Sequence, residues 1–294
     1  MRVRPFQTGD LTAAARLAGD LRAADAAVES FGEALPRLWD SERARRPLWR
    51  LAETDEGVAI GLAFALERQP GELDLYGAVT PSRRRAGVGS KLLQPALEAA
   101  ARDSLALHAQ VREPGAGRPF LERQGFAVAG RTLLLERHRR APAVSPASKT
   151  AVIRAADLRR PGDRALVLSL SSAAYLGVEE VFPLTEGDLG RFAAPEGLVL
   201  IGELDEEPAA YLTARALGPS LAIEEIGVLP AARRRGLGSA LLGQALRLSE
   251  ARTAVLAVDE QNASARGFYQ RLGFVQSSAR TRMRLAKAGE GRTL

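Results

Sequence analysis

Apolar residues follow two periodicities along this chain. Short runs with apolar residues at every or every second position, such as 58–66 and 198–204, are typical of strands. Longer stretches with apolar residues three to four positions apart, at 89–102, 164–174 and 238–251, are typical of amphipathic helices. Strands and helices in this order predict an α/β fold in which a mixed sheet is flanked by helices.

Two pairs of the predicted strands are separated only by short polar turns. The runs 48–52 and 58–66 flank one turn, and the runs 198–204 and 209–214 flank another. Acidic and Gly or Pro residues in both turns favour tight connections. We therefore expect one antiparallel hairpin in each half of the chain.

One segment of the sequence occurs twice. The sequence VLPAARRRGLGSALL begins at Val228, and the similar sequence VTPSRRRAGVGSKLL begins at Val79. Gly87 and Gly236 are separated by the same 149 residues as the two valines. A constant offset indicates an internal duplication of about half the chain.

The duplication predicts two domains joined by a linker. The stretch 139–150 is rich in Pro, Ser and Ala and has no periodicity, which is typical of a linker. We expect an N-terminal domain at 1–138 and a C-terminal domain at 151–294. A length of 294 residues and 46% hydrophobic residues suit two globular domains.

The composition excludes several classes of site. The chain contains no Cys, so a disulfide framework, a Cys-based metal site and a Cys nucleophile are excluded. The sequence has no apolar run long enough to span a membrane, and its first residues, MRVRPF, are typical of a strand and not of a signal peptide. We expect a cytoplasmic protein without a metal centre or a membrane partner.

The formal net charge is +6, and nearly all the basic residues are Arg. Proteins that bind nucleic acids usually combine a basic stripe with aromatic residues, but aromatic residues are only 5% here. Nucleic acid is therefore an improbable partner. The positive charge would attract an acidic substrate or an anionic cofactor.

The repeated segment has the features of a phosphate-binding loop. In each copy a strand leads into an Arg-rich turn with Gly-x-Gly, and the turn opens a helix. The first N–H groups of a helix have no intrahelical partner, and Gly236 and Gly238 would let a phosphate approach them. Neither copy has the Gly-Lys-Ser/Thr of a Walker loop, and the second copy lacks the third Gly of a Rossmann loop. A pyrophosphate is the expected ligand.

The Arg-x-x-Gly-x-Gly pattern after a Val-x-Pro strand end resembles that of the Gcn5-related N-acetyltransferases. A later stretch, which begins at Val255 and reads VLAVDEQNASARGFYQRLGF, strengthens the resemblance. It contains an apolar strand, Asn262, a short helix with Phe268-Tyr269, and Gly273-Phe274 before the next strand. The resemblance covers about 150–286 and, more weakly, 1–138.

This resemblance implies acetyl-CoA as the cofactor and a fold in which the strand before the loop splays from its neighbour. The pantetheine arm would lie along Ile226, Gly227 and Val228 in that gap. The pyrophosphate would bind the loop, whose residues are Arg233, Arg234, Arg235, Gly236, Leu237, Gly238 and Ser239. Asn262 would contact the cofactor arm, and Tyr269 would protonate the leaving thiolate. The reference pKa values of a thiol (~8.5) and a phenol (~10) are compatible with that transfer.

The general base has several candidates. Members of the family often carry a Glu six residues before the Val of the loop, where this chain has Ala222. Strand alternation would place Ala222, Glu224 and Ile226 on one face, so we expect Glu224 to act, directly or through water. Glu225 would face the other way unless a bulge reverses the alternation.

The first copy keeps the loop but not the later motif. Its candidate cofactor residues are Val79, Arg84, Arg85, Gly87, Gly89 and Ser90. Pro114 stands at the position of Asn262, and Leu121 at that of Tyr269. Leu75 stands at the position of Glu224. We expect the N-terminal domain to be catalytically weak or silent, whether or not it still binds CoA.

The leading hypothesis is an acetyl-CoA-dependent N-acetyltransferase with its chemistry in the C-terminal domain. The acceptor would be a primary amine on a small molecule or a peptide. The alternative is a regulatory module that binds CoA or acyl-CoA with little turnover. Residues that could line the acceptor site are Tyr175, Glu179, Glu180, Phe182 and Phe192. These motifs specify neither the acceptor nor the oligomeric state.

Overall fold

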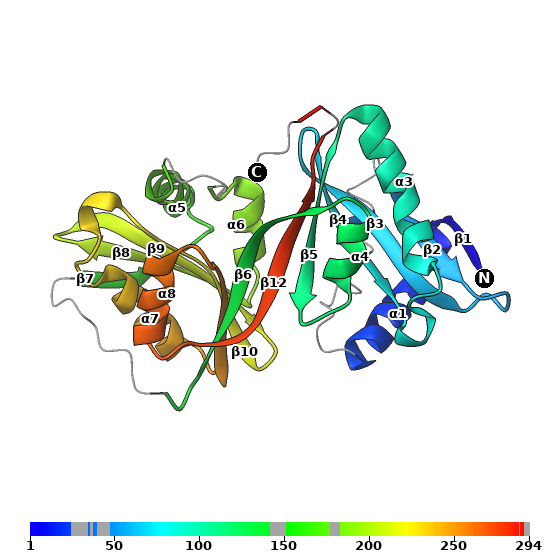
Figure 1. The fold of residues 1–294 in the computed structure, drawn as a ribbon. Helices are drawn as coiled ribbons and strands as arrows, with labels where there is room; N and C mark the ends of the chain where they lie inside the picture. Colours follow the sequence, from blue (N-terminus) through cyan, green and yellow to red (C-terminus); the bar gives the residue numbers. More distant parts are fainter. Residues whose placement is uncertain are drawn as a thin grey trace. The chain divides into compact units, whose positions relative to one another are not determined.

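The protein was analysed as a computed structural model that describes residues 1–24, 35, 38–39, 48–141, 151–176, 183–287 and 289–290 (Figure 1). The chain forms two compact units. Unit 1 comprises Met1–Arg131 with Arg280–Leu294, and unit 2 comprises Thr132–Ala279. Each unit contains a mixed sheet with helices on both faces, so the predicted α/β class is confirmed.

The sheet of unit 1 has the strand order β1-β2-β3-β4-β5-β12. The strands are β1 (Arg2–Pro5), β2 (Arg50–Glu53), β3 (Ala59–Gln69), β4 (Glu72–Val79), β5 (Ala106–Glu113) and β12 (Val275–Leu285). The first four are antiparallel, and β4 pairs with β5 in parallel. The helices are α1 (Leu11–Ala24), α3 (Val88–Asp103) and α4 (Gly117–Arg123), with short 3-10 turns η1 (Thr8–Asp10) and η3 (Pro81–Arg83).

The sheet of unit 2 has the strand order β6-β11-β10-β9-β8-β7. The strands are β6 (Ala127–His138), β7 (Ala151–Ala155), β8 (Gly197–Leu204), β9 (Glu207–Leu217), β10 (Ser220–Val228) and β11 (Thr253–Asp259). The helices are α5 (Pro161–Ala174), α6 (Glu186–Phe192), α7 (Leu237–Leu248) and α8 (Ala263–Arg271), with the 3-10 turn η4 (Pro230–Ala232). Both predicted hairpins, β2 with β3 and β8 with β9, and all three predicted helices are present.

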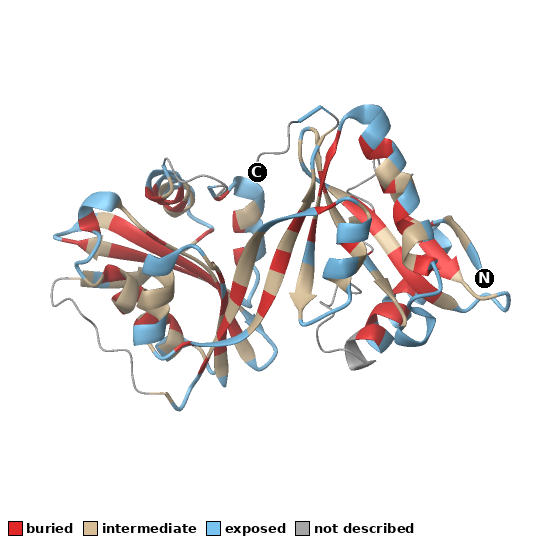
Figure 2. Ribbon diagram, in the orientation of Figure 1, coloured by how far each residue is buried: buried red, intermediate tan, exposed pale blue. Residues whose placement is uncertain are grey.

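Two apolar layers cover the sheet of unit 2. On one face, Leu237, Leu241 and Ala245 of α7 pack on the strands, because their spacing places them on one side of the helix. On the other face, α5 and α6 contribute Leu170 and Phe192 to a second cluster. Figure 2 shows the buried residues concentrated on the strands and on the inner sides of the helices. Among the helices that the structure describes, none combines the length and apolar character needed to cross a membrane.

The last strand of each sequence repeat belongs to the sheet of the other unit. Strand β6 comes from the first repeat, but its residues Thr132–His138 lie in unit 2, where they pair with β11. Strand β12 ends the second repeat, yet its residues from Arg280 onward belong to unit 1, whose strand β5 is the neighbour of β12. The compact units therefore differ from the sequence repeats at 1–138 and 151–294. Sequence similarity shows where a repeat ends, but it does not show which sheet edge its last strand pairs with.

This exchange predicts reciprocal effects of two core substitutions. Met283 of β12 is buried among the apolar residues of unit 1, and Leu135 of β6 is buried among those of unit 2. Met283→Ala should destabilise unit 1, and Leu135→Ala should destabilise unit 2. Each substitution should cost about 2–5 kcal/mol, because each leaves a cavity.

Hydrogen exchange of the full chain measures this, with β5 reporting on unit 1 and β11 on unit 2. Each variant serves as the control for the other. Faster exchange in β11 for Met283→Ala, with β5 unchanged, would contradict the strand exchange.

Candidate functional site

The central parallel strands of unit 2 separate partway along their length. Residues Ser220–Ala222 of β10 pair with Thr253–Val255 of β11. Beyond Ala222, β10 continues beside β9 to Val228, while β11 continues beside β6 to Asp259. Backbone groups of β10 that point away from β9 are then available to an extended ligand. Unit 1 has the same feature, since its parallel pairing ends at Leu75 and Ala109.

A β-bulge in β10 lies where this separation begins. The register with β9 shifts between Ile223 and Glu225, so Glu224 is the extra residue. A bulge reverses the alternation of the residues that follow it. The expectation that Ala222, Glu224 and Ile226 share one face is therefore wrong.

The bulge places Glu225 on the face that Ala222 occupies. Glu225 lies opposite Thr213, and Gly227 lies opposite Tyr211. Residues that pair across antiparallel strands share a face, and Tyr211 belongs to the apolar cluster beneath α5 and α6. Glu225 thus lies on the α5 and α6 side of the sheet, while Ile226 packs with the α7 side.

Glu225 is partly buried and hydrogen-bonded there. The hydroxyl of Tyr211 donates to Oε2 of Glu225 at 2.5 Å. Burial raises the pKa of the Glu225 carboxyl, and the hydrogen bond from Tyr211 opposes this effect. A carboxyl with a raised pKa beside an open strand edge is a candidate proton acceptor.

Glu224, the carboxylate favoured from the sequence, has different surroundings. It forms an ion pair with Arg215 of β9, and both side chains are partly exposed. The cation engages this carboxylate at the bulge, away from the Tyr211 contact of Glu225. The bulge is what distinguishes the surroundings of Glu224 from those of Glu225, and a pattern of residue types does not reveal a bulge.

Tyr269 lies on α8 among aromatic rings. Its ring contacts Phe268 and Phe274 edge-on, with centroids 5.1 Å and 5.7 Å away. Burial raises the pKa of the Tyr269 hydroxyl, and the nearby Tyr175 raises it further. Burial, and then the charge of Glu225, raises the pKa of Tyr175 to about 12. Tyr175 is therefore an electrostatic neighbour of both candidate catalytic residues, Tyr269 and Glu225.

The two phosphate-type loops have the same backbone conformation. Arg85 and Arg234 both have positive φ angles, of 63° and 65°. The glycines that follow two residues later also match, with φ of 77° at Gly87 and 88° at Gly236. Each of these glycines is the N-cap of its helix and supplies no capping side chain. The first N–H groups of α3 and α7 can therefore bind an anion.

The arginines of the second loop have separate structural partners. Arg233 donates through Nε to the carbonyl of Val228 at 3.1 Å and through a terminal nitrogen to the carbonyl of Ala174 at 3.0 Å. Arg235 forms an exposed ion pair with Asp205 at 2.9 Å. In unit 1, Arg84 donates to the carbonyl of Val79 at 3.1 Å, as Arg233 does to Val228. Arg233 and Arg84 thus shape the strand-to-loop turn.

The other glycines make room for aromatic rings. A Cβ on Gly238 would lie 3.2 Å from the ring of Phe268, and one on Gly89 would lie 3.3 Å from the ring of Phe120. The second glycine of each loop therefore lets a phenylalanine of the later motif pack against the loop helix. A Cβ on Gly227 would lie 2.2 Å from the ring of Tyr211, so this position has no room for a side chain.

The remaining cofactor candidates of unit 2 have varied surroundings. Asn262 is the exposed N-cap of α8, and its side-chain oxygen accepts from the N–H of Ala265 at 3.0 Å. Leu237 is buried in the core, so only its backbone could contact a ligand. Ser239 is partly buried in the first turn of α7, and Val228 packs against the core on the α7 side.

The equivalent face of unit 1 is apolar. Strands β3 and β4 remain in register from Gly61 to Glu67, without a bulge at this point. Leu62 occupies the position of Tyr211, and Phe64 and Tyr76 occupy the positions of Thr213 and Glu225. The rings of Phe64 and Tyr76 stack with centroids 5.1 Å apart and an interplanar angle of 9°. Leu121, at the position of Tyr269, is buried in the core.

Of the acceptor-site candidates, Tyr175 is close enough to Glu225 for the charge of Glu225 to raise its pKa. Phe192 is buried in the cluster beneath α6, so it is a core residue. Glu179, Glu180 and Phe182 lie outside the described residues. Sequence reasoning missed Ser171 and Tyr211, which are both buried beside Glu225.

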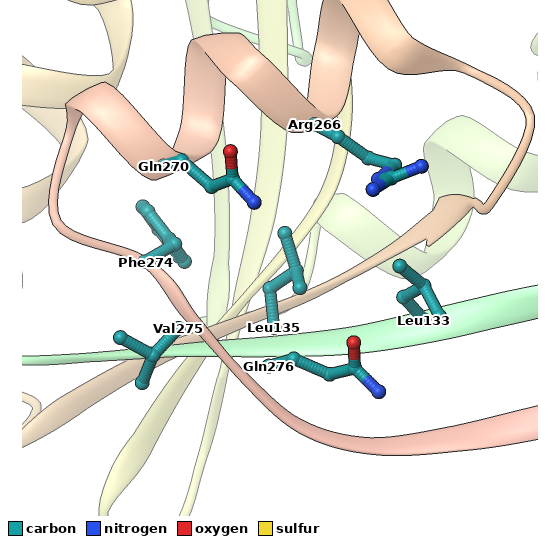
Figure 3. Close-up of a pocket in the computed structure, with 7 residues that line it drawn as sticks. All are labelled: Leu133, Leu135, Arg266, Gln270, Phe274, Val275 and Gln276. Atoms are coloured by element: carbon teal, nitrogen blue, oxygen red, sulfur yellow. The ribbon is translucent and has the colours of Figure 1, made fainter.

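A cavity of about 270 Å³ lies beside α8 in unit 2. Figure 3 shows Arg266 and Gln270 of α8 above Leu135 of β6, with Phe274 alongside. The full lining is Leu133, Leu135, Arg266, Gln270, Phe274, Val275 and Gln276. None of the candidate catalytic or cofactor-binding residues lines this cavity, although Arg266, Gln270 and Phe274 belong to the later motif.

Comparisons with known proteins agree with this architecture. The model of the Acetyltransferase (GNAT) family matches residues 20–126 and 166–274. A mycothiol acetyltransferase from Clavibacter michiganensis subsp. michiganensis is 30% identical over 97% of this chain and 94% of its own length. These matches confirm the expected tandem organisation, which resembles that of mycothiol synthase.

Two solved structures have the same fold over their full length. A GCN5-related N-acetyltransferase from Sphaerobacter thermophilus has a TM-score of 0.73 and 21% identity, covering 98% of this chain and 96% of its own. A tandem GNAT protein from the clavulanic acid biosynthesis pathway has a TM-score of 0.72 and 18% identity, covering 99% of both chains. The chain belongs to the acetyltransferase (GNAT) family, with two domains of this family in tandem, and it is an N-acetyltransferase.

Proposed function

We propose that unit 2 transfers the acetyl group of acetyl-CoA to a primary amine, with Glu225 as the general base and Tyr269 as the general acid. The observation that carries this proposal is the position of Glu225. Its carboxyl lies at the point where β10 and β11 separate, and its pKa is raised by burial. The family uses acetyl-CoA, and the separated strands offer a place for its extended arm.

The cofactor would bind along β10 and the following loop. The pantetheine arm would pair with the free edge of Ile226–Val228, as an added strand pairs with a sheet. The pyrophosphate would bind the N–H groups of Gly236–Ser239 at the N-terminus of α7. Arg234 would add positive charge, while Arg233 would hold the loop by its contacts with Val228 and Ala174. Asn262 would offer its side-chain NH₂ group to the arm while its oxygen caps α8.

The reaction would proceed by direct attack. Glu225 would accept a proton from the substrate ammonium, and the neutral amine would attack the thioester carbonyl carbon. A C–N bond forms, the C–S bond breaks, and Tyr269 would give its proton to the departing sulfur. A raised pKa makes a carboxylate a stronger base near neutral pH. Glu225 replaces Glu224 as the proposed base, because the bulge aims Glu224 at Arg215.

We propose the unacetylated amine precursor of mycothiol as the acceptor. The support is the similarity of nearly the whole chain to a protein named mycothiol acetyltransferase. Asp188 and Glu224 add negative potential near Glu225, which suits a cationic amine, although Arg191 partly offsets it.

We propose that unit 1 binds CoA without turning it over. Its loop has φ angles similar to those of the loop in unit 2, and its strands β4 and β5 also separate, two residues further along than β10 and β11 do. The stacked rings of Phe64 and Tyr76, however, occupy the positions of Thr213 and the proposed base. A carboxylate base and a tyrosine acid are both replaced there.

The first test is Glu225→Gln in the full chain. Loss of the base should lower kcat/KM for the mycothiol precursor roughly 10²–10⁴-fold while leaving the affinity for acetyl-CoA nearly unchanged. The matched control is Glu224→Gln, which removes a partly exposed ion pair and should lower kcat/KM less than about tenfold. A large loss of kcat/KM in Glu224→Gln, with a small loss in Glu225→Gln, would contradict this proposal and identify Glu224 as the base.

The second test is Tyr269→Phe, which keeps the ring contacts with Phe268 and Phe274 and removes the acidic proton. Turnover should fall roughly 100-fold or more. Because the pKa of Tyr269 is raised, the wild-type rate should show no alkaline loss from this group below pH ~10. Initial rates across pH, with calorimetry for CoA binding, give the result. Unchanged turnover would remove Tyr269 as the acid.

A further inference from the structure

Three hydrogen bonds connect Glu225 to the backbone of the segment before α6. The N–H of Leu184 donates to Oγ of Ser171 at 2.9 Å. The hydroxyl oxygens of Ser171 and Tyr211 are 3.1 Å apart, and Tyr211 is 2.5 Å from the Glu225 carboxylate. Ser171 and Tyr211 are both buried, so water does not compete for these contacts.

Counting the available protons sets the direction of donation along these three hydrogen bonds, which we call the hydroxyl chain. A hydroxyl has one proton to donate, and an ionised carboxylate can only accept, so Tyr211 gives its proton to Glu225. The Tyr211 oxygen then accepts from Ser171, and the hydroxyl of Tyr175 is a second hydrogen-bond neighbour of Tyr211, while the Ser171 oxygen accepts from Leu184. The peptide N–H of Leu184 cannot reverse, because a backbone nitrogen is only a donor. Each group of the hydroxyl chain therefore donates toward Glu225, and every donor has an acceptor when Glu225 is ionised.

A protonated Glu225 fits the same chain less well. If its carboxyl donated to Tyr211, Tyr211 would donate to Ser171. The oxygen of Ser171 would then accept two hydrogen bonds, one of them from Leu184, and its own proton would lose Tyr211 as an acceptor. The fixed donor at one end thus favours the carboxylate at the other.

Packing holds the Tyr211 ring in place. Tyr211 is fully buried among the apolar residues beneath α5 and α6. Its ring lies against Gly227, where a Cβ would approach to 2.2 Å. Gly227 is therefore required for the ring position, and the ring position sets the hydroxyl next to Glu225.

The corresponding positions of unit 1 lack this arrangement. Leu62 replaces Tyr211, and Tyr76 replaces Glu225. The carboxylate and its tyrosine partner are thus both replaced at these two paired positions of β3 and β4, in the unit that we expect to be silent. Of the two units, the one with the carboxylate at this position also has the tyrosine hydroxyl that contacts it.

We propose that Ser171 and Tyr211 are positioning residues that form a directed hydroxyl chain from Leu184, and that this chain orients Glu225 and keeps it ionised to receive the proton of the acceptor amine. The inference rests on the proposed role of Glu225. Neither hydroxyl contacts the reacting atoms, so their effect is exerted through the carboxylate.

Other groups around Glu225 act in known directions. Burial raises its pKa, as do Asp188 of α6 and Glu224 of β10, whereas Arg191 of α6 lowers it. The hydroxyl of Tyr175, at the end of α5, is also close enough to interact with its charge. Removing the Tyr211 hydroxyl leaves all of these in place, so the pKa of Glu225 should rise.

The test measures that pKa directly in the full chain. Carboxyl-¹³C glutamate labelling gives one resonance per Glu, and Glu225→Gln assigns the resonance of Glu225. In Tyr211→Phe the pKa of Glu225 should rise by roughly one to two pH units, as expected for the loss of one charge-assisted hydrogen bond. Ser171→Ala should raise it by a smaller amount. Tyr76→Phe removes the phenol that stands at the position of Glu225 in unit 1, and it should leave the pKa of Glu225 unchanged.

The titration and a rate profile separate the two proposals. With the mycothiol precursor as acceptor, the acidic limb of kcat/KM should move to higher pH by the same amount in Tyr211→Phe, with the high-pH plateau partly retained. An unchanged pKa in both Tyr211→Phe and Ser171→Ala overturns the hydroxyl chain, whatever the rates. A shifted pKa in a protein that acetylates no amine supports the chain and rejects the proposed function.

Discussion

The site of unit 2 depends on one extra residue in β10. Without the bulge at Glu224, Glu225 would point to the α7 side and its carboxyl would meet the apolar core. With it, the carboxyl reaches Tyr211 on the α5 and α6 side, just where β10 and β11 separate. Burying a carboxyl is unfavourable unless it is hydrogen-bonded, and Tyr211 supplies that bond. Gly227 supplies the space for the tyrosine ring, so three neighbouring features of two strands act together.

The duplication shows which of these features are specific to unit 2. Both loops keep the same positive φ angles, and both second glycines pack against a phenylalanine. The central parallel strands of both units also separate partway, two residues later in unit 1 than in unit 2. The strand face that holds Glu225 differs, because unit 1 has the aromatic stack of Phe64 and Tyr76 there, and Leu121 replaces Tyr269. The similar loops and the different strand faces are the basis for our proposal of one active and one silent copy.

Local patterns predicted the repeat, the hairpins, the loop helices and the family, because these depend on residue spacing. The bulge was not predictable in the same way, because it is a property of the register between β9 and β10, which residue spacing along one strand does not show. Glu224 was therefore favoured over Glu225. The exchange of β6 and β12 was also missed, since strand pairing over more than 100 residues leaves no local pattern. Asn262 and Tyr269 were found as motif positions, but their cap and ring contacts required the structure.

Calorimetric titration of acetyl-CoA into the full chain, followed by hydrogen exchange of the complex, is the most direct test of the proposed cofactor site in unit 2. The halves should not be separated, because each repeat gives its last strand to the other unit. We expect acetyl-CoA to bind, with slower hydrogen exchange in β10 and in the loop that opens α7. Slower exchange at the loop before α3 would accompany a second binding event. Binding that leaves β10 and the α7 loop unprotected, or no binding at all, would contradict the assignment of the cofactor site in unit 2.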